Sequence, residues 1–201
     1  MATTSDVIDA LAGIAPGSRL DTIRALRAEA RRNAQLSYLA LMEPASSGGV
    51  TAQERFAVAA FVAGLHGRPE TSDFYGTRLA ASGAPPTLRS AVAAAVAAGS
   101  ATGPYGHYPE GPLSVEDAAG PVYKVAGDTA DALGARLTAA FEHVHMLVFH
   151  PRDAAAASLQ SLLDAGWSTT DIVTLSQLVS FLAFQIRVVA GLRTLAPMLS
   201  A

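Results

Sequence analysis

Runs of apolar residues, many of them filled by alanine, alternate along the chain with short polar breaks rich in glycine and proline. Alanine is the strongest helix former, so stretches such as "AVAAAVAAG" and "DAAAASLQSLL" predict closely packed helices. The breaks end each run, because a helix rarely continues through such residues. The pattern predicts helices over 5–13, 18–42, 52–65, 69–82, 87–98, 128–149, 152–165 and 169–195. We therefore expect an all-α fold.

Three of these helices carry a start signal. A hydroxyl residue followed three positions later by a carboxylate lets both side chains bond to free backbone amides of the first turn. The pattern occurs at Ser18 with Asp21, at Thr51 with Glu54 and at Ser168 with Asp171. We expect each of these hydroxyl residues to be the N-cap of its helix.

The domain organisation is expected to be a single helical domain, 1–201, with an N-terminal helical extension over 1–45 and a loop over 99–121. The loop has glycine and proline too closely spaced for a long helix, and loops of this length are usually functional or disordered. Its Tyr105, His107 and Tyr108 favour an ordered loop. We interpret it either as a crossover lying over a neighbouring helix or subunit, or as a lid over a pocket.

A weak internal repeat relates the two halves of the chain. The segment "TRLAASGAPPTLRSAV" at 77–92 aligns with "QSLLDAGWSTTDIVTL" at 160–175. Both segments are expected to form a helix, a glycine stop, a short turn and a second helix. The repeat predicts two related helical hairpins packed about a pseudo-two-fold axis.

The net charge limits the possible partners. A net charge of -3 argues against a nucleic-acid-binding protein, which needs a basic surface. One basic cluster lies on the helix predicted over 18–42, whose apolar face would consist of Ile23, Leu26 and Ala30. The cluster comprises Arg19, Arg24, Arg27, Arg31 and Arg32. It is interpreted as a solvated helix face or a subunit contact, with an anion site as the alternative.

Cysteine is absent from the sequence, which excludes disulfides, thiolate nucleophiles and thiolate-bound metals. The first residues, "MATTSDVIDALAGI", have no basic region and do not resemble a secretory signal, so a cytoplasmic location is expected. The apolar stretch 172–189 is interrupted by polar residues that a lipid-spanning helix tolerates poorly. We expect a buried or interface helix there and no membrane association.

Two stretches carry a resemblance to a known family. These are "LLDAGWSTTDIVTLSQLVSFLAFQIRVVAGLRTL" at 162–195 and "TAQERFAVAAFVAGLHGRPETSDFYGTRLAASG" at 51–83. Both resemble the helical hairpins of the carboxymuconolactone decarboxylase and alkylhydroperoxidase D superfamily. The resemblance implies an alkylhydroperoxidase D-like helical bundle. It also implies a homo-oligomer, since family members assemble through these hairpins, and the helix over 173–192 is apolar around its circumference.

The family's peroxidase members use a glutamate, two cysteines and a histidine. Glu54 matches the glutamate, whereas His66 and Pro69 fall near the two cysteines and Asp73 or Tyr75 near the histidine. The Gly-Arg turn after His66 is closer to the decarboxylase members. The resemblance therefore implies acid–base rather than thiol chemistry, with Glu54, His66 and Tyr75 as candidate catalytic residues. His145, from the histidine-rich segment described below, is a fourth candidate.

Each of these residues also has a structural interpretation. Glu54 is explained by the capping pattern with Thr51. His66 lies at a helix C-terminus, where it can act as a cap. Tyr75 can be a buried tyrosine bonded to a backbone carbonyl.

The segment "FEHVHMLVFHP" concentrates Glu142, His143, His145 and His150 within nine residues. Glu142 and His145 share a helix face, but a carboxylate-bridged metal pair needs a second such motif, which the sequence lacks. We therefore expect no metal, and interpret the histidines either as packed or interface residues or as proton-transfer groups. Glu142, His143 and Arg152 are the candidate substrate-binding residues.

The function expected from the sequence is the binding of a small organic molecule, without a cofactor. The expected pocket is lined by the 52–66 helix, the helix containing Tyr75 and the histidine-rich end of 128–149, with Glu54 accepting a proton. A non-catalytic oligomeric interaction protein of the same fold is the alternative. A cavity at these residues favours the first interpretation, and solid packing there favours the second.

Overall fold

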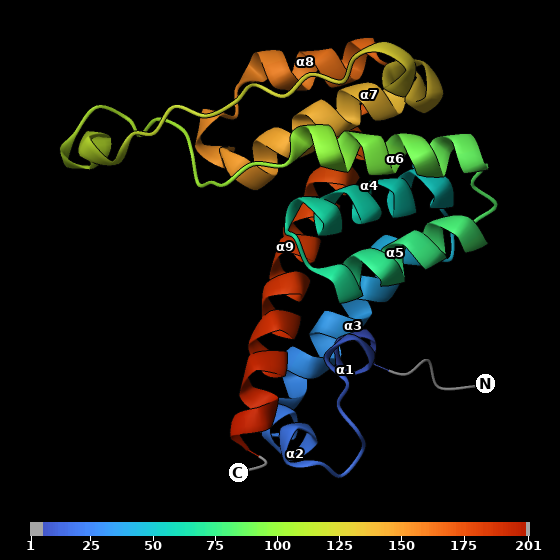
Figure 1. Cartoon of the computed structure of the whole chain (residues 1–201), viewed down its shortest axis with the longest axis vertical. Helices are drawn as coiled ribbons and strands as arrows, with labels where there is room; N and C mark the ends of the chain where they lie inside the picture. Colours follow the sequence, from blue (N-terminus) through green and yellow to red (C-terminus); the bar gives the residue numbers. More distant parts are fainter. Residues whose placement is uncertain (1–5, 200–201) are drawn as a thin grey trace.

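The computed structural model describes residues 6–199, and within this range all regular secondary structure is helical, as expected (Figure 1). Two short 3-10 helices, η1 (Pro112–Glu116) and η2 (Pro151–Asp153), accompany the α-helices. The α-helices are α1 (Val7–Ala12), α2 (Arg19–Ala25), α3 (Ala28–Met42), α4 (Ala52–Leu65), α5 (Pro69–Ala81), α6 (Pro86–Gly99), α7 (Gly127–Phe149), α8 (Ala156–Asp164) and α9 (Thr169–Met198). Residue 5, where the first helix was expected to start, lies outside the described range.

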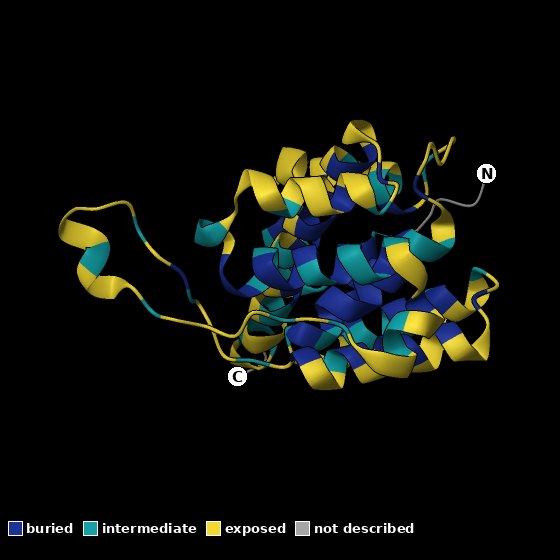
Figure 2. Cartoon of the chain, turned by 90° about the horizontal axis from the view of Figure 1, so that it is seen from above, coloured by how far each residue is buried: buried dark blue, intermediate teal, exposed yellow. Residues whose placement is uncertain are grey.

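Helix α4 is the centre of the bundle. It packs against α5, α6, α7 and α9, and every residue from Arg55 to Ala63 is buried. Buried residues gather in the middle of the bundle, whereas exposed residues predominate on its outside (Figure 2). Alanines and a glycine make this possible, because short side chains let four neighbouring helices approach one backbone. At Gly64 a Cβ atom would overlap the side chain of Val96 on α6. The alanine-rich sequence of α4 therefore fixes the close spacing of the core.

Helix α9 connects the two ends of the molecule. It begins beside α8 and α7, crosses α4 and ends among α1 and α3 (Figure 1). Its length and composition would allow it to cross a membrane. Half of its most apolar stretch is buried inside the chain, a property shared by core helices of soluble proteins.

The start signals are confirmed. Thr51 with Glu54 and Ser168 with Asp171 form reciprocal capping boxes. Ser18 accepts a hydrogen bond from the amide of Asp21, whereas the Asp21 carboxylate accepts from the amide of Gly17.

The prediction of one helix over 18–42 is wrong, because the chain breaks between α2 and α3 at Leu26 and Arg27. The break is accompanied by ion pairs with α1. Arg24 is buried and binds Asp6 and Asp9, while Arg31 binds Asp9 and also Asp21 on α2. Acidic side chains of this chain therefore neutralise Arg24 and Arg31, for which a solvated helix face or a subunit contact was expected.

Leu26 does not contribute to the expected apolar face, since 78% of its surface is exposed. Two further boundaries differ from the predictions. α7 is interrupted at Gly134, whose φ of 71° and ψ of 167° are accessible almost only to glycine. The helix expected over 152–165 is divided into η2 and α8, because Ala154 and Ala155 are extended.

The expected loop forms an arm over 100–126 that projects from the bundle (Figure 1). Gly106 and Ala118 form an antiparallel bridge at its base, and Leu113 and Val115 near its tip are exposed. The returning segment 122–124 lies along α7 and borders a cavity. The arm thus combines a projecting tip with a segment that covers a pocket.

The local pattern of the internal repeat is present in the structure. α5 and α6 are joined through Gly83, with φ of 82°, and α8 and α9 through Gly166, with φ of 89°. Both glycines adopt the left-handed conformation that ends a helix and allows a sharp turn.

Candidate functional site

A cavity of about 350 Å³ lies between α7, α8 and the returning segment of the arm. We call it the α7/α8 cavity. Its size falls in the range of small-molecule sites. It is lined by Val122, Tyr123, Lys124, Ala139, Glu142, His143, Met146, His150, Asp153, Ala157, Ser158 and Ser161.

Helix periodicity explains why α7 supplies so much of this wall. The lining positions 139, 142, 143 and 146 are separated by three, four or seven residues from position 139, so they share one face of the helix. His150 joins them from the C-cap position just after α7. The dense histidine segment found in the sequence therefore splits between two faces. His143 and His150 border the cavity, whereas His145 does not.

His143 presents two free ring nitrogens. The side chain is buried with 6% exposure, and neither Nδ1 nor Nε2 has a hydrogen-bond partner. Burial lowers the pKa of His143, so the ring is neutral near pH 7. A neutral imidazole offers one donor and one acceptor, and both are available to a molecule in the cavity.

His150 is positioned by an acid. Its Nδ1 lies 3.3 Å from Oδ2 of Asp153, while its buried Nε2 has no partner. The amide of His107 on the arm donates to Oδ1 of Asp153 at 2.9 Å. This hydrogen bond is the main cause that lowers the pKa of Asp153, so the carboxylate stays charged. A carboxylate near Nδ1 favours the tautomer in which Nε2 can accept a proton.

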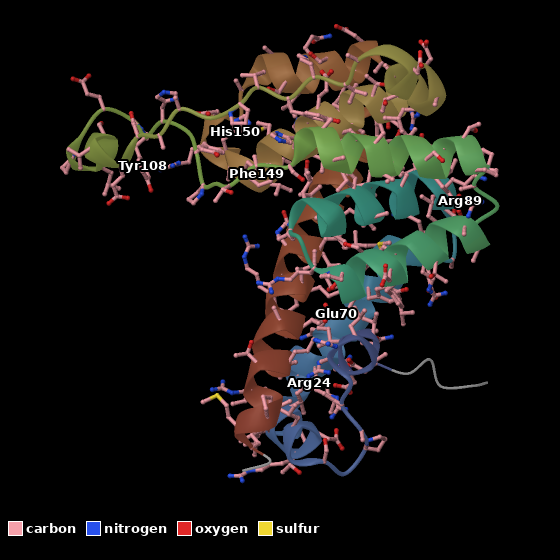
Figure 3. All side chains as sticks on the ribbon, in the orientation of Figure 1. Arg24, Glu70, Arg89, Tyr108, Phe149 and His150 are labelled. Atoms are coloured by element: carbon pink, nitrogen blue, oxygen red, sulfur yellow. The ribbon has the colours of Figure 1, made fainter. Side chains whose placement is uncertain are left out.

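Opposite charges and hydroxyl groups complete the cavity. Lys124 Nζ donates to Glu142 Oε2 at 2.5 Å, and the amide of Val125 donates to Glu142 Oε1 at 3.2 Å. Ser158 and Ser161 of α8 line the opposite side. The cavity therefore has basic, acidic and hydroxyl groups around one volume. Figure 3 shows His150 where α7 meets the base of the arm.

His145 lies behind this wall. Its Nε2 donates to the carbonyl of Gly99 at 2.9 Å, and its ring lies 4.8 Å from the rings of both Tyr123 and Phe149. Burial is the main cause that lowers its pKa. The ring thus fastens the arm and α6 to α7.

Glu54 is fully engaged by structural partners. Its Oε2 accepts from the amide of Thr51 at 2.8 Å, and its Oε1 accepts from Nε of Arg136 at 2.8 Å. Arg136 also donates to the carbonyls of Gly49 and Gly166. Glu54 therefore joins the start of α4 to α7 and does not line the α7/α8 cavity.

His66 and Tyr75 are likewise held by the bundle. Nδ1 of His66 donates to the carbonyl of Val62 at 3.0 Å, and burial is the main cause that lowers the pKa of His66. The Tyr75 hydroxyl donates to Oε1 of Gln185 on α9 at 2.5 Å, and both side chains are fully buried. Burial raises the pKa of Tyr75. The partner of Tyr75 is thus a side-chain amide, where the structural interpretation had a backbone carbonyl.

Arg152 belongs to the base of the arm. It donates to the carbonyl of Tyr105, and its guanidinium lies 4.0 Å from the ring centre of Tyr108. Of the seven candidate residues, the structure brings Glu142 and His143 together in the α7/α8 cavity. The single pocket expected at Glu54, Tyr75 and the end of α7 is not formed by this cavity.

The sequence pattern pointed to a structural role for Asp153, at a helix start, to no functional role for Lys124, and to none for His150 beyond its cluster. One local signal existed, since Asp153 follows His150 by three residues. Lys124 reaches Glu142 only because the arm folds back along α7. Within residues 6–199, no group of three or more histidine or acidic side chains is arranged to hold a metal ion.

Comparisons with models of protein families, with curated proteins and with solved structures gave no match to this chain. The function must therefore be inferred from the chemistry of the α7/α8 cavity. The family resemblance continues to rest on the sequence patterns of the two hairpins.

Proposed function

We propose that the chain binds a small polar organic molecule in the α7/α8 cavity and acts on it by proton transfer. One observation carries this proposal: three buried ring nitrogens of His143 and His150 have no hydrogen-bond partner among the described residues, 6–199. Buried polar atoms in folded proteins are nearly always satisfied, and leaving one unpaired costs about 1–3 kcal/mol. A polar ligand would supply the missing partners.

The groups around the cavity suggest separate roles. His150 would accept a proton at Nε2, and Asp153 would stabilise the imidazolium that results. His143 would orient the substrate by a hydrogen bond. Lys124 and Glu142 would bind polar groups at the side of the arm. Glu54, Tyr75 and His145 have structural roles in this proposal.

The proposal agrees with the acid–base chemistry that the family resemblance implies. The α4–α5 and α8–α9 hairpins would be those of a carboxymuconolactone decarboxylase or alkylhydroperoxidase D-like protein without the thiols. Such a protein would act in the cytoplasm and need no cofactor.

Ligand-observed NMR tests the proposal. A library of small carboxylic acids, ketones and lactones is screened against the wild-type protein. Compounds that bind in the cavity should bind at least tenfold more weakly to His143→Phe and His150→Gln. His66→Gln serves as the control, because His66 lies outside the cavity. This variant should bind the compounds with the affinity of the wild type. The proposal is contradicted if no compound of the library binds in the cavity. It is also contradicted if the compounds that bind have the same affinity for both cavity variants as for the wild type.

A second candidate function, as a subunit of an assembly, is favoured by an apolar face on α8 and α9. Leu159, Val173 and Phe184 are each more than 40% exposed and border one shallow depression. Contiguous exposed apolar surface commonly marks a contact with another protein. A homo-oligomer formed through this face is compatible with a functional α7/α8 cavity.

A further inference from the structure

A groove of about 600 Å³ lies on the other side of the bundle, with α4 as its floor and α5 and α6 as its walls. It shares no residue with the α7/α8 cavity. The lining side chains are small or apolar except at a few positions. They belong to Ala60, Gly64, Gly67, Arg68, Pro69, Ser72, Gly76, Leu79, Arg89, Val92, Ala93 and Val96.

The groove is open at Gly76, in the wall formed by α5, because glycine has no side chain. A Cβ atom built at Gly76 of α5 would meet no atom within 4 Å. α5 and α6 both pack on α4, and only a short turn joins them (Figure 1). The floor consists of Ala60 and Gly64 of α4, and the α6 wall is apolar at Val92, which is buried, and at Val96, which is half-buried. The buried Leu79 adds an apolar side chain from α5.

Two arginines lie at opposite ends of the groove. Arg68 is the N-cap of α5, and Arg89 is in the first turn of α6, which runs back along α5 (Figure 3). The groove extends from Pro69 to Leu79, or about 15 Å at the rise of an α-helix. A cationic group therefore stands at each end of an elongated apolar surface.

Both arginines lack a counterion. Within residues 6–199 neither Arg68 nor Arg89 has an ion-pair or hydrogen-bond partner for its guanidinium. By contrast, nine of the eleven other arginines there bind a carboxylate or a carbonyl: Arg24, Arg31, Arg32, Arg55, Arg78, Arg136, Arg152, Arg187 and Arg193. Arginine is suited to planar carboxylates, which it binds through two parallel hydrogen bonds.

We propose that this groove binds an elongated aliphatic carboxylate. Its hydrocarbon chain would lie over Gly76 and Val92, and a carboxylate would pair with Arg68 or Arg89. A carboxylate at each end would engage both arginines, so a dicarboxylate binds more tightly than the monocarboxylate. This site is independent of the α7/α8 cavity and of any reaction there.

Isothermal titration calorimetry with three ten-carbon probes tests the proposal. Decanedioate and decanoate, below its micelle concentration, should both bind, and uncharged decanol should bind at least tenfold more weakly. Arg68→Gln and Arg89→Gln should each weaken decanedioate about fivefold, the effect of one well-formed exposed ion pair. His143→Phe should leave the affinity for decanedioate unchanged, which separates this site from the α7/α8 cavity.

Gly76→Leu fills the groove and should abolish binding. Gly191→Leu is the matched control, since Gly191 is also helical and also has open space at its Cβ position, but lies on α9 outside the groove. Gly76→Ala adds one methyl group, should keep most of the binding and should raise the melting temperature, because alanine favours a helix over glycine.

Three outcomes overturn the proposal. The first is that decanoate and decanedioate fail to bind the wild-type protein. The second is that Gly76→Leu, with a normal melting temperature, binds them as well as Gly191→Leu does. The third is that Gly76→Leu reduces the molecular mass in light scattering while the wild type binds neither acid, which would assign the groove to a second copy of the chain.

Discussion

Arg136 joins three separate parts of the fold. Its guanidinium donates to Glu54 at the start of α4, to the carbonyl of Gly49 and to the carbonyl of Gly166. It also lies 4.4 Å from the ring centre of Trp167, whose Nε1 donates back to the carbonyl of Arg136 at 3.0 Å. Glu54 supplies the only carboxylate of this network within residues 6–199.

We expect Glu54→Gln to destabilise the protein by about 1–2 kcal/mol, since it weakens a helix cap and removes the charge facing Arg136. Urea denaturation measures this loss. Glu29→Gln is the control, because the Glu29–Arg32 ion pair is exposed on both sides and should contribute less than about 0.5 kcal/mol. Equal stability of both variants would show that Glu54 has no structural role and would restore it as a candidate base.

At the scale of elements, α7 depends on one glycine. Gly134 breaks the helix with a positive φ, so the residues before it form a short separate turn and those after it form the face of the cavity. Leu133 and Leu137 on the two sides are both buried. The break therefore keeps apolar side chains in the core while changing the backbone direction.

Gly134→Ala should destabilise the protein by about 1–3 kcal/mol, because a Cβ atom is strained at this φ and ψ. Thermal and urea unfolding measure the change. Gly191→Ala in the regular part of α9 should have the opposite effect and stabilise by up to about 1 kcal/mol. A Gly134→Ala protein as stable as the wild type would mean that α7 can run straight.

At the scale of the whole molecule, two buried histidines and one half-buried histidine couple the fold to pH. His66, His143 and His145 come from the α4–α5 turn and from α7, and burial is the main cause that lowers the pKa of each. An unfolded histidine has a pKa near about 6.5. Above that value the histidines are neutral in both states and contribute nothing to the pH dependence.

The free energy of unfolding should therefore be constant from about pH 8 to 7 and decrease as the pH falls below about 6.5. In this pH range the histidines of the unfolded chain become protonated, whereas the same histidines in the folded chain stay neutral. The depressed pKa values of Asp21 and Asp153 act only at lower pH, where these carboxylates lose their stabilising charge. Urea titrations across this range test the sign, and His143→Leu should make the decrease shallower. A free energy of unfolding that increases as the pH falls below about 6.5 would contradict this prediction.

The apolar face on α8 and α9 leads to a prediction about assembly. We expect size-exclusion chromatography with light scattering to give a mass above the 20.6 kDa of one chain at micromolar concentration. Val173→Glu with Phe184→Glu should shift the mass toward that of a monomer, because charges do not bury in an apolar contact. A wild-type protein that is monomeric at this concentration would contradict the candidate function as a subunit of an assembly.

The sequence by itself determined the all-helical class, most of the helices and three of their N-caps. Thr51 with Glu54 and Ser168 with Asp171 act within one turn, so their effect is readable from spacing alone. The alanine runs likewise predicted close helix packing. The histidine-rich segment near residue 145 lies at the end of α7, and His143 and His150 of this segment border the α7/α8 cavity.

Only the tertiary structure decided which groups meet. The arginines near the N-terminus were expected to face solvent, and Arg24 is instead buried by aspartates of α1. His143 and His145 are two residues apart, yet one borders the cavity and the other binds Gly99. The physical reason is the distance along the chain over which each kind of interaction acts. Caps and helix propensities act within about one turn, whereas ion pairing and cavities depend on how helices far apart in sequence pack together.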